Sequence, residues 1–257
     1  MRHIEKFPKV VTLFPTVISI SRKPLVVIAV FLFFLSGCAT TANVKKVQLL
    51  DSLDPTVQVL LMPMDVELSL LTAAGLMEPQ AEWTQNAIGH MTKSLERRLA
   101  SADYRLLHYP DAATDPATDV GQLQKLHETL GSVILQHHLG MLKLPTKGNG
   151  AVFDWTLGEK AELLKELTGA DYALFVYVRD SYSTGGRVAM QLGLALLGVG
   201  IQGGMQLGFA SLVDLSSGDV VWFNRLISSS GDLREQEPAD QSVLSLMSDF
   251  PGLQPQN

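Results

Sequence analysis

The sequence YALFVYV at residues 172–178 decides the fold. It is almost continuously apolar and rich in aromatic and β-branched side chains, so it predicts a central strand that is covered on both faces. Upstream, Thr156 and Glu159 form a T-x-x-E pattern, which predicts a helix that starts with a capping box. Gly169 is placed to end that helix. Residues 180–186 predict a turn after the strand.

Toward the C-terminus, two β-rich segments surround a short turn. Residues 205–215 and 220–227 are separated by the sequence SSGD at 216–219, which predicts an antiparallel hairpin. Residues 238–250 predict a last helix whose apolar side chains face the core, namely Val243, Leu246, Met247 and Phe250.

Toward the N-terminus, strand and helix patterns alternate. Residues 57–64 (VQVLLMPM) predict a buried strand that Pro63 ends, and residues 104–109 predict another strand. Residues 79–100 predict an amphipathic helix, because apolar residues recur every four positions: Trp83, Ala87, Met91, Leu95 and Leu99. The apolar stripe of a second helix consists of Leu123, Leu126, Leu130, Val133, His137 and Met141. This order predicts an α/β (α+β) sandwich with a mixed sheet of about four to five strands.

The N-terminal residues have the pattern of an export signal. Arg22 and Lys23 precede an apolar stretch of eleven residues, 25–35, which small residues follow. A membrane-spanning helix needs about 20 residues, so the stretch predicts a cleaved secretory signal peptide.

The end of that stretch, Leu35-Ser36-Gly37-Cys38, resembles the lipobox of bacterial lipoproteins, and Cys38 is the only cysteine in the chain. The resemblance implies that signal peptidase recognises Leu35, Ser36 and Gly37. It also implies that Cys38 becomes the first mature residue, with a diacylglycerol thioether and an acyl chain such as palmitate. Ala39 stands where an aspartate would favour the inner membrane, so the resemblance favours the periplasmic face of the outer membrane, with the inner membrane as the alternative.

These observations divide the chain into a signal peptide (1–37), a lipidated tether (38–54) and a single periplasmic α/β domain (55–257). Without residues 1–37 the chain holds 15 basic and 25 acidic residues, a net charge of −10. Such a charge disfavours nucleic acid and anionic lipid surfaces as partners.

The order of elements behind a lipobox resembles a group of periplasmic domains. The group includes the curli-secretion lipoprotein, the lipoprotein activators of penicillin-binding proteins and the N-terminal domain of the translocation protein TolB. The resemblance rests on the VQVLLMPM strand with its helix, the strand GADYALFVYV and the hairpin LVDLSSGDVVWF. It implies a domain that binds other proteins or forms assemblies and catalyses no reaction.

Residues 188–213 contain no charged residue. We weigh three interpretations: a buried helix followed by a glycine-rich bend, a self-association surface around the G-x-x-x-G at Gly204–Gly208, and insertion into a bilayer. The G-x-G-x-x-G at residues 198–203 precedes a strand instead of following one, so it does not predict a nucleotide site.

No pattern in the sequence recommends a catalytic or metal site. His137 and His138 are adjacent on a helix and diverge, and His127-Glu128 lacks the second histidine of H-E-x-x-H. Asp65, Glu67 and Asp180 follow predicted strands, where open sheets bind ligands, although solvated loops explain them as well. Trp155 and Trp222 are expected in core or edge packing, with a role as a protein-binding anchor as the alternative. We therefore expect no enzyme activity, metal or cofactor beyond the lipid.

The sequence leads to one hypothesis and two alternatives. The hypothesis is a membrane-anchored, non-catalytic adaptor or assembly factor that binds an envelope protein. The first alternative is an oligomeric export pore or scaffold that uses residues 188–213. The second is an envelope hydrolase or small-ligand carrier, which would need a deep pocket lined by perturbed carboxylates.

Overall fold

A computed structural model describes residues 54, 56–100, 102, 104–109, 115–138, 144–146 and 153–253. All of them fall in one compact unit of the chain. The predicted signal peptide, the signal-peptidase residues Leu35, Ser36 and Gly37, the lipidation residue Cys38 and almost all of the tether lie outside the described residues.

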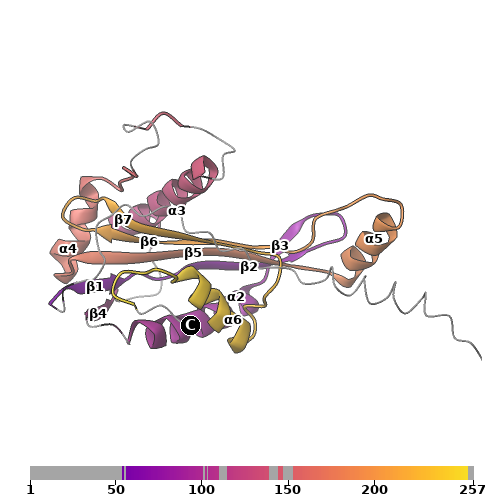
Figure 1. The fold of residues 1–257 in the computed structure, drawn as a ribbon, viewed down its shortest axis with the longest axis horizontal. Helices are drawn as coiled ribbons and strands as arrows, with labels where there is room; N and C mark the ends of the chain where they lie inside the picture. Colours follow the sequence, from indigo (N-terminus) through magenta and orange to yellow (C-terminus); the bar gives the residue numbers. More distant parts are fainter. Residues whose placement is uncertain are drawn as a thin grey trace, which may run out of the picture. The chain divides into compact units, whose positions relative to one another are not determined.

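The described residues form the following helices and strands (Figure 1). In chain order they are β1 (Gln58–Leu61), β2 (Asp65–Leu71), β3 (Met77–Pro79), α2 (Ala81–Leu99), β4 (Arg105–His108), α3 (Asp119–His138), the 3-10 turn η1 (Glu159–Ala161), α4 (Glu162–Thr168), β5 (Tyr172–Ser183), α5 (Gly185–Ala195), β6 (Gln206–Asp214), β7 (Val220–Ser228) and α6 (Gln236–Leu246).

In the part of the chain that the structure describes, the strands form one mixed sheet of seven, and β5 is its central strand. On one side β5 pairs in parallel with β1 and β2, and on the other it pairs antiparallel with β6, which pairs antiparallel with β7. The short strands β4 and β3 extend β1 and β2. The predicted mixed α/β sandwich and the β6–β7 hairpin are confirmed, with more strands than expected because β1 and β2 share one edge of β5.

The first strand ends at Leu61, two residues before Pro63, so the strand end that the proline predicts is confirmed. Leu61 is paired with Leu174 and Asp65 with Tyr177, so three intervening residues on one side face two on β5. This extra residue is a β-bulge, and the proline, which has no N–H to donate, lies within it. The strand line then continues as β2.

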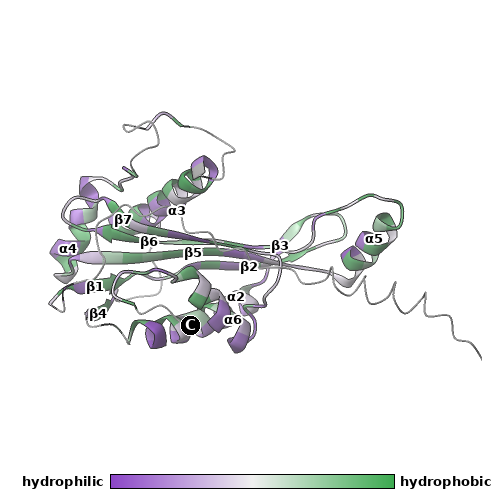
Figure 2. Cartoon of the chain, in the orientation of Figure 1, coloured by the Kyte–Doolittle hydropathy of each residue, from purple (hydrophilic) through white to green (hydrophobic). Residues whose placement is uncertain are grey.

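Alternate side chains of β5 contribute to two separate cores. Leu174, Val176 and Val178 belong to the core under α2 and α6. Ala173 and Phe175 belong to the core under α3 and α4. Helices therefore cover both faces of the sheet, and the strands between them are mostly hydrophobic (Figures 1 and 2). This arrangement confirms the doubly covered strand that YALFVYV predicts.

The two long helices differ in how well their patterns predicted them. Most of the α2 stripe is buried, as expected: Ala87, Met91, Leu95 and Leu99. The predicted stripe of α3 is confirmed only in part: Leu123 and His137 are buried and Leu130 packs against the same core, but Leu126 is 44% exposed and His127 is buried instead. Gly131 is also buried, and a Cβ there would lie 2.0 Å from the Phe209 ring. Met141 lies outside the described residues.

The predicted capping box is wrong. The Thr156 hydroxyl accepts a hydrogen bond from the Gly158 N–H over 2.9 Å, and Thr156 forms a β-bridge with Asp219. The helix starts later, through the turn η1. Its predicted end is confirmed, because Gly169 adopts a φ of 75° and its N–H donates to the Lys165 carbonyl over 2.7 Å.

The predicted turn at residues 180–186 is also wrong. β5 continues to Ser183, because its two neighbours run alongside it to that point: Asp180 is paired with Gln206 of β6, and Ser183 with Leu71 of β2. Helix α5 starts almost at once, at Gly185.

Candidate functional site

The end of the sheet where β2 and β5 finish carries a projection that we call the tip, defined as residues 72–77 and 184–205. It contains the loop between β2 and β3, helix α5 and the segment that leads into β6 (Figure 1). Hydrogen bonds join its parts: the Thr184 N–H donates to Leu71 O over 3.0 Å, and the Arg187 guanidinium to Thr72 O over 3.3 Å. The Thr184 hydroxyl also accepts from the Arg187 N–H, so it caps the start of α5.

The long polar side chains of α5 point inward. Arg187 Nε donates to the carbonyl of Gln202 over 3.0 Å, and Gln191 Nε2 donates to the carbonyl of Ile201 over 3.2 Å. These two residues are four positions apart and therefore share one face of the helix. That face lies against the segment leading into β6, and its polar groups are paired within the tip.

The apolar side chains of the tip point outward. None of the residues of α5 is buried. In Figure 2 much of α5 and the segment after it is green. The exposed fractions of the large apolar residues are 43% for Val188, 37% for Met190, 66% for Leu192, 89% for Leu196, 77% for Leu197 and 48% for Val199, with 63% for Leu76 on the neighbouring loop and 53% for Met77 at the start of β3. An exposed apolar patch of this kind marks a contact surface.

The prediction of a buried helix within residues 188–213 is therefore wrong. The glycines at 204 and 208 also have a role within the chain. A Cβ at Gly204 would lie 2.0 Å from Ser181 O, and one at Gly208 would lie 2.8 Å from Tyr177 O. Both glycines allow β6 to approach β5, so they are not free to form a self-association motif. No helix among the described residues combines the length and apolar character that crossing a membrane requires.

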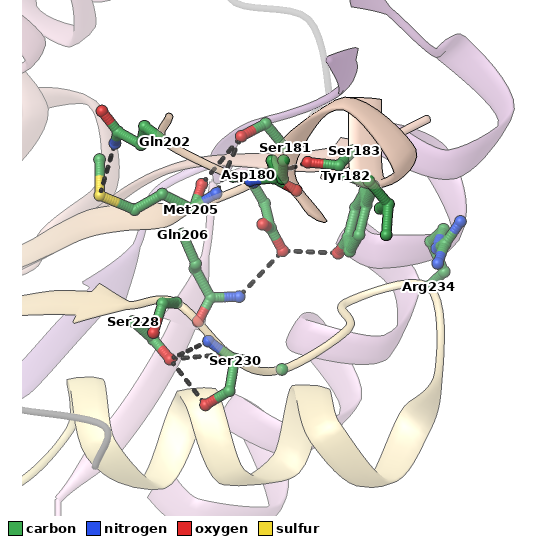
Figure 3. Close-up of a pocket in the computed structure, with 16 residues that line it drawn as sticks. Asp180, Ser181, Tyr182, Ser183, Gln202, Met205, Gln206, Ser228, Ser230 and Arg234 are labelled. Carbon is green, nitrogen blue, oxygen red and sulfur yellow. Dashed lines mark hydrogen bonds between the residues drawn. The ribbon is translucent and has the colours of Figure 1, made fainter. Parts of the chain in front are cut away.

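An open pocket of about 510 Å³ lies at the base of the tip (Figure 3). Its lining comes from the end of β5, from α5, from residues 202–206, from the end of β7 and from the loop before α6. Most of the lining side chains are hydroxyls and amides, which both donate and accept hydrogen bonds. They include Ser181, Ser183, Gln191, Gln202, Gln206, Ser228, Ser229 and Ser230.

Asp180 is the single carboxylate that lines this pocket. It lies inside β5, not after it as predicted, and it is 4% exposed. Its Oδ2 accepts hydrogen bonds from the Tyr182 hydroxyl over 2.5 Å and from Gln206 Nε2 over 3.0 Å. Burial raises the pKa of Asp180, and these hydrogen bonds oppose the rise. The carboxylate thus connects β5 to β6.

The same network continues to α6 and to the loop before it. Gln206 Oε1 accepts a hydrogen bond from the Ser242 hydroxyl over 2.9 Å, and the Tyr182 hydroxyl accepts from the Leu233 N–H over 2.8 Å. A buried network of satisfied polar groups fixes the geometry around it. The one sign of this network in the sequence is a glutamine, Gln206, at the start of a mostly apolar strand.

Arg234 forms the rim of the pocket and stacks on two aromatic rings. Its guanidinium carbon lies 4.1 Å from the centroid of the Tyr182 ring and 4.7 Å from that of Trp83, within cation–π range. Its Nη2 lies 2.6 Å from Asp232 Oδ2. Hydrogen bonding to Arg234 holds the pKa of Asp232 below its usual value.

The other two acidic residues singled out in the sequence lie elsewhere. Asp65 begins β2, with its Oδ1 2.8 Å from Arg179 Nη2 and its Oδ2 3.8 Å from Lys125 Nζ. Glu67 lies within β2, not in a loop after a strand. The neighbours Val66 and Leu68 face the α2 core, so Asp65 and Glu67 point to the opposite face from Asp180. The structure does not bring the three carboxylates together.

The histidines are separated and make different contacts. His127 is buried, its Nε2 is hydrogen-bonded to the Ser211 hydroxyl, and its ring stacks on Phe175 with 4.7 Å between centroids. Burial lowers the pKa of His127 to about 3. His137 Nδ1 accepts from the Leu144 N–H over 3.0 Å. In the described part of the chain, no three His, Cys, Asp or Glu residues are grouped to hold a metal ion.

The two tryptophans considered in the sequence differ in burial. Trp222 is 5% exposed and packs edge-on against Phe250, with 5.0 Å between ring centroids. Trp155 is half-buried and lies against His137, with 5.7 Å between centroids. Trp222 is therefore a core residue, as expected.

No family model matches the sequence, and no curated protein matches it. Among solved structures, the chain is similar to a PelC dodecamer from Paraburkholderia phytofirmans, at 13% identity and a TM-score of 0.41 over 84% of this chain and 100% of that one. It is also similar to lipoprotein GNA1162 from Neisseria meningitidis, at 15% identity and a TM-score of 0.26 over 66% and 77%. A third similar structure is the LpoB C-terminal domain from Salmonella enterica, at 14% identity and a TM-score of 0.24 over 67% and 82%. At these values the likenesses assign neither a family nor a function to the chain.

Proposed function

We propose that the chain is a lipoprotein, anchored to the outer membrane and facing the periplasm, that acts as a non-catalytic adaptor or assembly factor by binding an envelope protein. The observation that carries this proposal is the open pocket at the base of the tip. Its exposed hydroxyl and amide side chains, Gln202, Ser229 and Ser230, come from separate segments and lie at one opening. Groups of this kind recognise a partner's backbone and polar side chains through hydrogen bonds.

The chemistry of the pocket supports binding over catalysis. Asp180 is the carboxylate that an envelope hydrolase would use, and burial does raise its pKa. Its Oδ2, however, already accepts hydrogen bonds from Tyr182 and Gln206. A general acid or base needs a free path to its substrate, often within hydrogen-bond distance. We therefore assign Asp180 a structural role in shaping the pocket.

The lipid anchor supplies the mechanism. A triacylated Cys38 would hold the domain at a bilayer permanently, since two or more acyl chains give stable anchoring. Confinement to a thin layer raises the effective concentration of the domain for any partner in the same layer. A pocket of modest affinity then suffices for efficient binding.

The test is site-specific photo-crosslinking in living cells. A photoreactive amino acid at Ser229, an exposed residue of the pocket, should capture one envelope protein reproducibly. The same amino acid at Gln122, exposed on α3, is the control and should not capture it. Equal capture at both positions, or none at Ser229, would rule out the pocket as the binding surface.

A second candidate function is an oligomeric export pore or scaffold. The exposed apolar surface of α5 favours it, because copies of the chain could cover this surface for one another. A single ring-sized species in a mild detergent extract, which breaks up when Leu196 is replaced by Glu, would support this candidate. A monomer under all conditions would exclude it.

A further inference from the structure

The tip has an inverted distribution of polarity. The polar side chains of α5 face the interior of the tip and bond to its backbone, and the leucines face solvent. A helix of a water-soluble domain has the opposite arrangement, with its apolar stripe against the core. An element whose surroundings are apolar has its polar groups satisfied internally and its apolar side chains outside.

The backbone of the tip follows the same rule where it joins the sheet. The Ser183 hydroxyl accepts from the Gly204 N–H over 3.0 Å, and the Ser181 hydroxyl accepts from the Met205 N–H over 3.0 Å. The Arg187 guanidinium satisfies carbonyls of the two segments beside α5, Thr72 O and Gln202 O. The tip therefore carries few polar groups that need water.

The charge of the tip differs from that of the domain around it. Residues 72–77 and 184–205 contain one charged residue, Arg187, and no acidic residue. The chain from residue 38 onward has a net charge of −10, which opposes contact with an anionic bilayer at other surfaces. The tip is thus the part of the domain that can approach a membrane without acidic groups.

The exposed side chains also surround α5 on more than one side. Met190 and Leu192 are two positions apart and diverge by about 200° around the helix axis. Both are exposed, whereas Val188, close to the direction of Leu192, lines the pocket at the base of the tip. A protein partner or a second copy covers one face of a helix, whereas a fluid bilayer covers all exposed directions at once.

We propose that the tip inserts into the interfacial region of a lipid bilayer, as a second membrane contact in addition to the lipid on Cys38. At eleven residues α5 is about 16 Å long, too short to span a membrane, so it lies in the interface. Burial of its leucines, not attraction of charge, drives the insertion, and it depends weakly on salt.

The proposed anchor and the tip can reach the same membrane. The domain begins with β1, beside the start of β5, and the tip follows the other end of β5. The twelve residues of β5 separate these ends by about 40 Å. Residues 38–54 extend over at most about 56–61 Å, so the tether is long enough to run along the sheet.

The test uses the lipid-bearing chain as cells produce it, reconstituted in phosphatidylcholine vesicles. An environment-sensitive fluorescent amino acid replaces Leu196 in the tip or, as the matched control, Leu167, an exposed leucine of α4. We expect brominated acyl chains to quench the probe at 196 at least about threefold more than the probe at 167, at low and high salt alike. The expected fluorescence of the probe at 196 is also blue-shifted on addition of vesicles.

Charge substitutions complete the test. With the probe at 196, Leu192→Glu plus Leu197→Glu should abolish the quenching by lipid, whereas Leu126→Glu plus Leu167→Glu, two exposed leucines outside the tip, should leave it unchanged. Insertion is contradicted if iodide in water quenches both probes equally and brominated lipid quenches neither. It is also contradicted if, without lipid, an oligomer shields the probe at 196 from iodide and the variant with Leu192→Glu plus Leu197→Glu no longer forms that oligomer. Neither result depends on which protein the pocket captures.

Discussion

His127 is the residue whose surroundings differ most from what its type suggests. The ring is buried between Phe175 and Phe209 and hydrogen-bonded to Ser211, and burial lowers its pKa to about 3. In the unfolded chain the pKa of a histidine is about 6.5. The folded state therefore holds this side chain neutral over a range of pH in which the unfolded state is protonated.

This difference predicts a specific loss of stability in acid. The free energy of unfolding has its full value above pH 6.5 and declines as the pH falls toward 3, because only the unfolded state binds a proton at His127 in that range. For a pKa lowered from 6.5 to about 3, the full effect is roughly 5 kcal/mol. Urea unfolding of His127→Leu should change less between pH 7 and pH 4.5 than that of the wild type. If the free energy of unfolding of His127→Leu and of the wild type fell equally between pH 7 and pH 4.5, this account would be contradicted.

Tyr182 allows a second prediction at the residue scale. Its hydroxyl donates to Asp180 and accepts from the Leu233 N–H. Tyr182→Phe leaves both groups without this partner, so we expect a loss of about 1–3 kcal/mol in the free energy of unfolding. Asp180→Asn keeps an acceptor and should cost less. Equal costs for the two substitutions in urea unfolding would show that the hydroxyl does not organise the network.

At the scale of elements, two glycines in helices should respond oppositely to alanine. Alanine in a helix interior normally stabilises by about 0.5–1 kcal/mol, and we expect this gain for Gly89→Ala in α2, where a Cβ meets no atom within 4 Å. In α3, a Cβ at Gly131 would lie 2.0 Å from the Phe209 ring, so Gly131→Ala should destabilise by about 1–3 kcal/mol. Thermal and urea unfolding of both variants measure this, and the same sign for both would be inconsistent with the packing.

The same contrast explains how far the sequence could predict the elements. The buried face of α2 could be predicted from the sequence because its buried positions are mostly apolar. The buried face of α3 includes His127 and Gly131, which a count of apolar residues overlooks, and Leu126 is exposed instead. The capping box at Thr156 failed because that residue pairs with Asp219, a partner distant in the sequence.

The candidate site was less predictable than the fold. The absence of charge in residues 188–213 correctly singled out this segment as unusual. An apolar helix, however, is as consistent with burial in the core as with exposure at the surface. Only the structure shows that nothing among the described residues buries α5. The pocket could not be foreseen either, because Asp180, Gln206 and Ser242 meet through pairing of β5 with β6 and packing of α6.

For the whole molecule, the structure separates the core from the tip. Leu192, Leu196 and Leu197 are largely exposed, so replacing all three with Glu should change the free energy of unfolding by less than about 0.5 kcal/mol. Leu164→Ala, in the fully buried part of the α4 core, should cost about 2–5 kcal/mol. Urea unfolding compares the two. A large loss for the tip variant would mean that α5 is part of the core.

The most direct test of the adaptor account repeats the crosslinking at Ser229 in cells that express either the wild type or Cys38→Ala. The account predicts that the wild type captures one envelope protein and that the unlipidated variant, at equal abundance, loses this capture. Undiminished capture by Cys38→Ala would contradict tethering as the mechanism, and capture of only further copies of the chain would contradict the adaptor itself.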